Sequence, residues 1–157
     1  MHVTVAEFER KLADRLEALG ISDARDIAWA CAWLEACGYP GIAMLAEALS
    51  GGARDRELAR DALGFDLDNV SCAFLAPRIM RDVTSHGRVF LRNVRHGLYM
   101  LPFTVRANLG IGCPVDPAFA GGGERHKNPY TEKLAMAEAN GLDIDDAKWA
   151  ALVPAST

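Results

Sequence analysis

The sequence lacks a basic excess and long apolar runs, and both absences exclude broad classes of protein. It has 17 Lys and Arg against 21 Asp and Glu, a formal net charge of −4. Proteins that bind nucleic acid non-specifically gather Lys and Arg to neutralise phosphates, so we expect no nucleic-acid partner. No segment approaches the roughly 18 apolar residues of a membrane span, and charges stand where a signal peptide needs an apolar core. We therefore expect a cytoplasmic chain with no membrane partner.

The sequence also lacks the cysteine and histidine spacings of common metal sites. None of the cysteines forms a CxxC pair, which fits neither a zinc ribbon nor a small disulfide scaffold. The histidines at 86, 96 and 126 lack an i, i+4 or HxH spacing. We therefore predict no metal, and we interpret the cysteines as free thiols: Cys31, Cys37, Cys72 and Cys113.

What is present is the composition of a soluble globular domain, with 50% hydrophobic and 24% charged residues in 157. This length and balance predict one domain over residues 1–157. The periodicity of the apolar residues favours an α+β fold that is mostly helical, with an N-terminal helical hairpin and a small β-sheet.

The hairpin is predicted from two helical patterns with clear ends. Thr4 begins a capping box, and apolar side chains recur at helical spacing until Gly20. A second pattern, capped by Ser22 or Asp23, runs to Gly38. Because the connection is short, the two helices should pack side by side.

Further helices are expected over residues 42–49, 54–63, 72–83, 98–109 and 129–140, with a last short one capped by Asp143 or Asp145. Pro77 predicts a bend or a helix start within 72–83. The strand is expected at residues 89–91, in a sheet built around 89–94, with 111–115 as a candidate partner strand. The predicted core comprises Phe8, Leu12, Leu16, Trp29, Trp33, Leu34, Phe74, Leu75, Phe90, Leu91, Leu98, Leu101, Phe103 and Trp149.

Polar side chains follow the predicted strand directly. His96 comes after the strand end, where the backbone is held while a ring can point into a cleft, and Asn93 and Arg95 add a donor and a charge. A structural hydrogen-bonding role for His96 is the alternative. The glycine-rich segment 121–129 could cradle an anion through its amides and Arg125, or be a bare surface loop.

Five arginines, at 78, 81, 88, 92 and 95, form a local basic cluster that could bind a carboxylate bidentately. The alternative is that they are solvated. The predicted ligand-binding residues are Arg92, Asn93, Arg95, His96, Gly122, Arg125 and Asn128.

The order of these motifs resembles that of the malate/L-lactate dehydrogenase-like oxidoreductases. Members of that family carry an Arg-Asn-x-x-His segment after a strand and later a Gly-Gly loop ending in Asn-Pro, both near the nicotinamide cofactor. The resemblance implies a cofactor-side role for Asn93, His96, Gly122, Asn128 and Pro129.

Two departures separate the chain from that family. The family places Ser-His-Gly, with its catalytic histidine, after the second helix, whereas residues 37–41 here read CGYPG. The family also continues into a long cofactor-binding region, where this chain has two helical segments. The pattern as a whole, including residues 140–149, resembles a bacterial family of unknown function that is a shortened relative of the dehydrogenases.

Two functional hypotheses follow. The first is a non-catalytic binding or accessory protein that holds a small anionic ligand or a protein partner between residues 93–96 and 121–128, with no cofactor. The second is an oxidoreductase related to the malate/L-lactate dehydrogenases, using NAD(P) and a partner subunit that supplies the missing region. Under either hypothesis, a homodimer is expected to cover apolar surface that the longer relatives bury internally.

Overall fold

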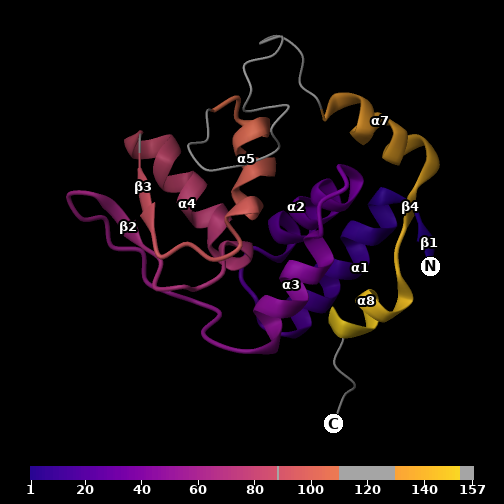
Figure 1. Cartoon of the computed structure of the whole chain (residues 1–157), viewed down its shortest axis with the longest axis horizontal. Coiled ribbons are helices and arrows are strands. Elements are labelled where there is room, and N and C mark those ends of the chain that lie inside the picture. The colour runs from indigo at the N-terminus through magenta and orange to yellow at the C-terminus, as the bar shows by residue number, and fades with distance from the viewer. Residues whose placement is uncertain (88, 110–129, 153–157) are drawn as a thin grey trace.

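The computed structural model describes residues 1–87, 89–109 and 130–152, which form a mostly helical α+β fold. The elements in chain order (Figure 1) are β1 (His2–Val3), α1 (Val5–Ala18), α2 (Ala24–Ala36), α3 (Gly41–Ser50), β2 (Gly64–Asp66), α4 (Cys72–His86), β3 (Phe90–Arg92), η1 (Gly97–Tyr99), α5 (Met100–Arg106), α7 (Thr131–Asn140), β4 (Leu142–Asp143) and α8 (Asp146–Leu152). None of the helices in the described residues combines the length and the apolar character that a membrane span requires.

The N-terminal helical hairpin is confirmed. Thr4 is the N-cap of α1, and its hydroxyl accepts from the Glu7 amide at 3.1 Å, as the capping box predicts. Asp23 is the N-cap residue of α2, but its carboxylate pairs with the guanidinium of Arg81 on α4 instead of capping the helix. Asp23 therefore stands at the start of α2 and also connects the helical hairpin to α4.

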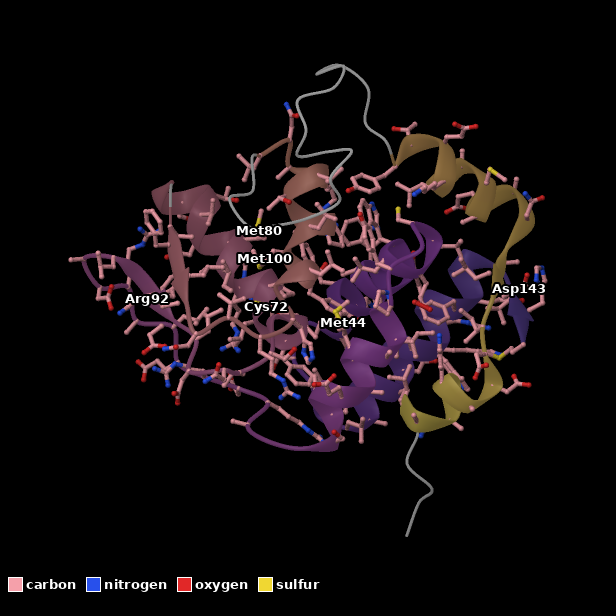
Figure 2. The ribbon with its side chains drawn as sticks, in the orientation of Figure 1. Met44, Cys72, Met80, Arg92, Met100 and Asp143 are labelled. Carbon is pink, nitrogen blue, oxygen red and sulfur yellow. The ribbon has the colours of Figure 1, made fainter. Side chains whose placement is uncertain are left out.

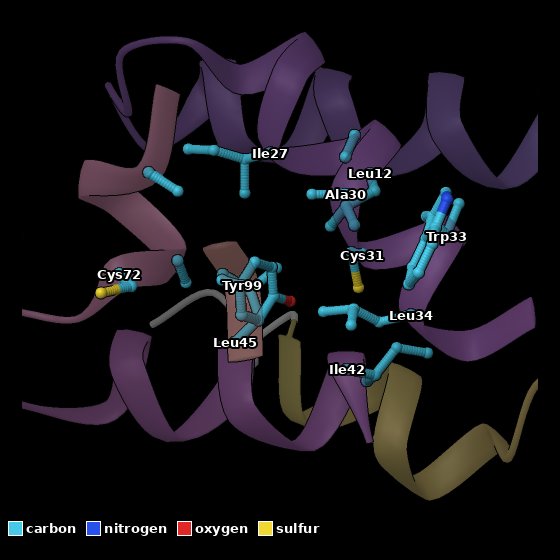
Figure 3. Packing of buried hydrophobic residues seen from close by; sticks show 14 of the residues in the cluster. Leu12, Ile27, Ala30, Cys31, Trp33, Leu34, Ile42, Leu45, Cys72 and Tyr99 are labelled. Atoms are coloured by element: carbon cyan, nitrogen blue, oxygen red, sulfur yellow. The ribbon is translucent and has the colours of Figure 1, made fainter. Parts of the chain in front are cut away.

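The central helix of the fold is α2, which contacts α1, α3, α4, α5 and α7. Its buried residues lie all round the helix and are mostly small, which lets neighbouring helices approach closely. Figure 3 shows Cys31 and Leu34 of α2 packed near Leu45 of α3 and Tyr99 of η1. The fully buried Tyr99 hydroxyl donates to the Gly41 carbonyl at 2.6 Å, which ties η1 to the start of α3.

At the start of α3, a side chain from the preceding helix provides the hydrogen-bond acceptor for a free backbone amide. Its N-cap position is Pro40, which has no side-chain cap, and the Glu35 carboxylate accepts from the Gly41 amide at 3.0 Å. A Cβ at Gly41 would lie 2.9 Å from the Cys31 carbonyl oxygen, so glycine permits the close approach of α2 and α3.

The described residues form two small sheets of two strands each. In the first, β1 pairs antiparallel with β4. In the second, β3 pairs parallel with β2, with Phe65 opposite Leu91. The predicted strand at residues 89–91 is therefore confirmed, while its partner β2 was not predicted. The candidate strand at 111–115 lies outside the described residues.

The prediction of helical turns over residues 54–63 is wrong, because this segment is irregular up to β2. Its aspartates bond local backbone groups instead of leaving them to a helix: Asp61 accepts from the amides of Leu63 and Gly64. Its charges also pair with α4, since Asp55 lies 2.6 Å from Arg78. These competing bonds favour an extended path along α4.

The other helices lie close to the predicted ranges. Ser71 caps α4, and Pro77 lies inside that helix rather than starting it. At the C-terminal side, the Asp145 carboxylate accepts from the Lys148 amide at 3.0 Å, so Asp145 caps α8, one of the two residues predicted for that place.

Nine of the predicted core residues are buried, and four more pack against the core while half-exposed. Phe90 is the exception, with 68% exposure. Side chains alternate across a strand, so Leu91 faces inward and its neighbour Phe90 faces solvent.

Candidate functional site

The segment that follows β3 lies along residues 67–72, at the N-terminus of α4. The carbonyl of Arg92, the last residue of β3, accepts from the Leu67 amide at 2.9 Å, and the carbonyl of Arg95, within the segment, accepts from the Cys72 amide at 2.9 Å. The Cys72 amide is one of the first-turn donors of α4 that the helix itself cannot satisfy. This docking places four of the sequence-predicted residues in one region.

Two residues of the segment adopt left-handed backbone conformations. Asn93 has a φ of 53° and His96 a φ of 56°. Such conformations are uncommon outside glycine, although Asn and His tolerate them better than most, and they concentrate at sites where the surrounding structure fixes the backbone. Here hydrogen bonds on both sides fix it, since Asn69 donates to the Asn93 carbonyl and Tyr99 to that of His96, each at 3.0 Å.

The His96 ring is held between Ser71 and Glu47. Its side chain is 10% exposed, and Nδ1 lies 2.7 Å from Ser71 Oγ. Ser71 Oγ also accepts from the Ala73 amide at 3.1 Å. Because the group facing Nε2 is the Glu47 carboxylate, which can only accept, the ring proton is assigned to Nε2, and Nδ1 then accepts from the Ser71 hydroxyl. Nε2 lies 3.6 Å from Glu47 Oε1, which is beyond hydrogen-bond length.

The charge state of His96 follows from its surroundings. Burial lowers the pKa of the ring, and the Arg95 guanidinium lowers it further, against an opposing effect of Glu47. The ring is therefore neutral at pH 7 and presents Nε2–H as a donor.

Arg95 converges with His96 on the same carboxylate. Arg95 Nη2 lies 3.3 Å from Glu47 Oε1, the oxygen that His96 Nε2 also faces. The Glu47 side chain is 64% exposed, and hydrogen bonding from Arg95, followed by the charge effect of His96, lowers the pKa of its carboxyl. Two donors held by one rigid segment thus point at one exposed anionic oxygen.

Arg92 and Asn93 pair with a different part of the chain. The Arg92 guanidinium pairs with Asp61, and Asn93 Nδ2 donates to Asp66 Oδ1 at 2.8 Å. The pKa of Asp66 is lowered first by the Asn93 bond and then by the Asp68 amide. Figure 2 shows Arg92 at the end of the molecule formed by β2 and β3.

The arginine cluster read from the sequence is compensated inside the chain. Arg81 binds Asp23 through a two-pronged contact with both distances at 3.1 Å, the bidentate geometry expected for a carboxylate, but with an internal partner. Arg78 likewise pairs with Asp55. Arg88 lies outside the described residues.

The other half of the predicted site also lies outside the described residues. This applies to Gly122, Arg125 and Asn128, and to His126 and Pro129. The structure therefore describes one side of the expected site, residues 92–96, together with carboxylates and a serine that the sequence did not single out.

Sequence reasoning missed Glu47 and Ser71. Ser71 carried a usable signal, because a serine directly before an apolar run is typical of an N-cap. Glu47 carried none, since a glutamate on a short helix is commonly solvated, and 48 positions separate it from Arg95.

A second feature lies at the other end of the molecule, near Asp143 in Figure 2. An open groove of about 470 Å³ is lined by the C-terminal ends of α2 and α7 and by β4. Lys133 Nζ lies 3.5 Å from the Cys37 carbonyl oxygen, and burial raises the pKa of the Cys37 thiol to about 11. The thiol is therefore protonated at neutral pH, and the groove offers no reactive group through it.

Within the described residues, no group of three or more His, Cys, Asp and Glu side chains is placed to hold a metal ion. Comparison of the chain with protein-family models, with curated proteins and with solved structures gave no match. The interpretation of the site therefore depends on its own geometry.

Proposed function

We propose that this chain is a non-catalytic binding or accessory protein that holds a small anion through Arg95 and His96. The observation that carries the proposal is the convergence of Arg95 Nη2 and His96 Nε2 on one oxygen of Glu47. The exposed Glu47 carboxylate shows that the space in front of Arg95 and His96 accepts an anionic oxygen, and a ligand carboxylate or phosphate offers the same kind of oxygen. A protein partner would present the same chemistry through an acidic side chain.

The surroundings of His96 favour binding over nucleophilic catalysis. A serine, a histidine and a glutamate do lie in a row, but Ser71 is 1% exposed and its hydroxyl already accepts from an amide. A nucleophile must reach its substrate, and a serine that caps a helix in the interior does not. Nδ1 of His96 is already hydrogen-bonded to Ser71, which leaves Nε2 as the ring donor for a ligand.

The site is built for an anion with accessible oxygens. Arg95 is 33% exposed, so a ligand can reach its guanidinium from solvent while the ring of His96 stays fixed. A fixed ring reduces the entropy lost when a ligand is bound. The expected ligand is therefore a small carboxylate or phosphate that bridges the two side chains.

A thermal-shift titration with inorganic phosphate and with malonate tests the proposal. A ligand at about 100 times its Kd adds about 2.7 kcal/mol of stability, which corresponds to a rise in Tm of roughly 5–11 °C for a domain of this size. Arg95→Ala should abolish the rise. Arg10→Ala, which removes an exposed arginine of α1, serves as the matched control and should keep it. Equal shifts in both variants would show that the anions act through general charge effects.

The oxidoreductase hypothesis remains as an alternative proposal. It is supported by the position of Asn93 and His96 directly after β3, where the resemblance to the dehydrogenases implies cofactor-side residues. Titration with reduced nicotinamide cofactor, followed by energy transfer from tryptophan, tests it. Saturable transfer that is lost in His96→Asn would favour this alternative, whereas a flat titration would remove it.

A further inference from the structure

Glu47 lies on α3 in a position that contributes little to the core. The neighbouring residues Leu45, Ala48 and Leu49 are buried, while the Glu47 side chain points out of the helix and is 64% exposed. Its carboxylate is held by Arg95 at 3.3 Å and faces His96 at 3.6 Å. The carboxylate therefore occupies the space in front of the two ligand-binding donors without being needed to fill the interior.

We propose that Glu47 is a built-in competitor for the anion site, which an incoming carboxylate or phosphate must displace before it binds Arg95 and His96. This inference rests on the proposed function, because it concerns regulation of the same site. An internal anion of this kind lowers the apparent affinity for ligands, since only molecules with Glu47 turned away are competent to bind.

The contacts of Glu47 allow such displacement. Exposed ion pairs are weak, because solvent screens them and two long side chains lose freedom when they meet. The distance from His96 Nε2 to Glu47 Oε1 is longer than a hydrogen bond, so a ligand oxygen placed closer to the ring gains a bond that Glu47 does not make. Rotation of the glutamate side chain into solvent requires no movement of α3.

The magnitude of the competition can be bounded. An exposed ion pair is worth at most a factor of about five in equilibrium constant, and loss of the like charge beside a bound anion adds a factor of a few more. Removal of the charge of Glu47 should therefore lower the Kd for inorganic phosphate by about fivefold to twentyfold at low ionic strength.

The test compares Glu47→Gln with Glu17→Gln by calorimetric titration with inorganic phosphate. Glu17 is an exposed residue of α1, so its variant makes the same change in net charge without touching the site. We expect tighter binding in Glu47→Gln, no change in Glu17→Gln, and loss of the gain in the Glu47→Gln/Arg95→Ala double variant. Circular dichroism confirms that each variant is folded.

The outcomes separate this inference from the function on which it rests. Equal and saturable binding by the wild type and Glu47→Gln, lost on Arg95→Ala, would overturn the competitor role and leave the anion site standing. Equal tightening in both glutamine variants would reduce the effect to net charge and also overturn the role of Glu47. No saturable binding by the wild type or by Glu47→Gln would overturn both proposals.

Discussion

Replacement of His96 by alanine tests the described geometry at the point where structure and function meet. The change removes the acceptor that lies 2.7 Å from the Ser71 hydroxyl, and Ser71 is 1% exposed. A buried hydroxyl that loses its partner destabilises a protein by about 1–3 kcal/mol. We therefore expect a loss of about 2 kcal/mol in the free energy of unfolding, or a fall in Tm of about 4–8 °C for a chain of this size.

His96→Asn is the matched variant for this experiment. Asparagine tolerates the left-handed backbone found at His96, where φ is 56°, and its side-chain oxygen can accept from Ser71 near the place of Nδ1. Because both the backbone and the hydrogen bond are retained, the loss should stay below about 1 kcal/mol. The His96→Asn substitution also removes Nε2, so ligand binding should weaken while stability is kept.

Urea unfolding followed by tryptophan fluorescence provides the free energies, and a double-mutant cycle with Ser71→Ala isolates the pair. The cycle should give a coupling of about 0.5–3 kcal/mol, because each single change strands the other partner. If the free energy of unfolding of His96→Ala lies within about 0.5 kcal/mol of the wild-type value and the coupling energy is zero, the description of an enclosed His96 ring bonded to Ser71 is wrong.

Three further predictions concern stability. Tyr99→Phe leaves the Gly41 carbonyl without its donor and should lower the free energy of unfolding by about 1–3 kcal/mol in urea titrations, whereas an unchanged midpoint would contradict the bond. Gly64→Ala should destabilise by at least about 2 kcal/mol, because φ is +124° and the new Cβ would lie 2.1 Å from the Phe90 carbonyl oxygen; a neutral effect would contradict the pairing of β2 with β3. Because the pKa of His96 is lowered on folding, its contribution to stability is complete above about pH 6.5 and declines as pH falls toward the folded value. Thermal scans from pH 7.5 to 5 should show a decline that is smaller in His96→Asn, and identical profiles would refute the assignment.

Local signals in the sequence were sufficient for the elements whose stability is local. The capping box at Thr4 and the stop at Gly20 mark α1, because each bond involved spans only a few residues. The strand at β3 was also predicted, from a run of apolar residues before polar ones. These features depend on neighbours in the chain, which is the information that periodicity contains.

Features that depend on distant partners could not be predicted. The irregular segment over residues 54–63 has helical composition, but pairing of its charges with α4 outweighs the propensity of each residue. The exposure of Phe90 follows from the register of β3 against β2, and a one-residue change of register would reverse it. In the candidate site, His96 was identified by its place after a strand, while Ser71 and Glu47 reach it from 25 and 49 positions away.

The central claim is that Arg95 and His96 hold a small anion, and nuclear magnetic resonance of their side-chain nitrogens during a phosphate titration at pH 7 tests it most directly. His96 Nε2, to which the ring proton is assigned, faces Glu47 in the free protein, so its signal reports replacement of the carboxylate. The account predicts that the His96 and Arg95 signals shift together and saturate with one Kd, and that this Kd is lower in Glu47→Gln. Saturable shifts confined to other residues, with His96 and Arg95 unchanged, would contradict it.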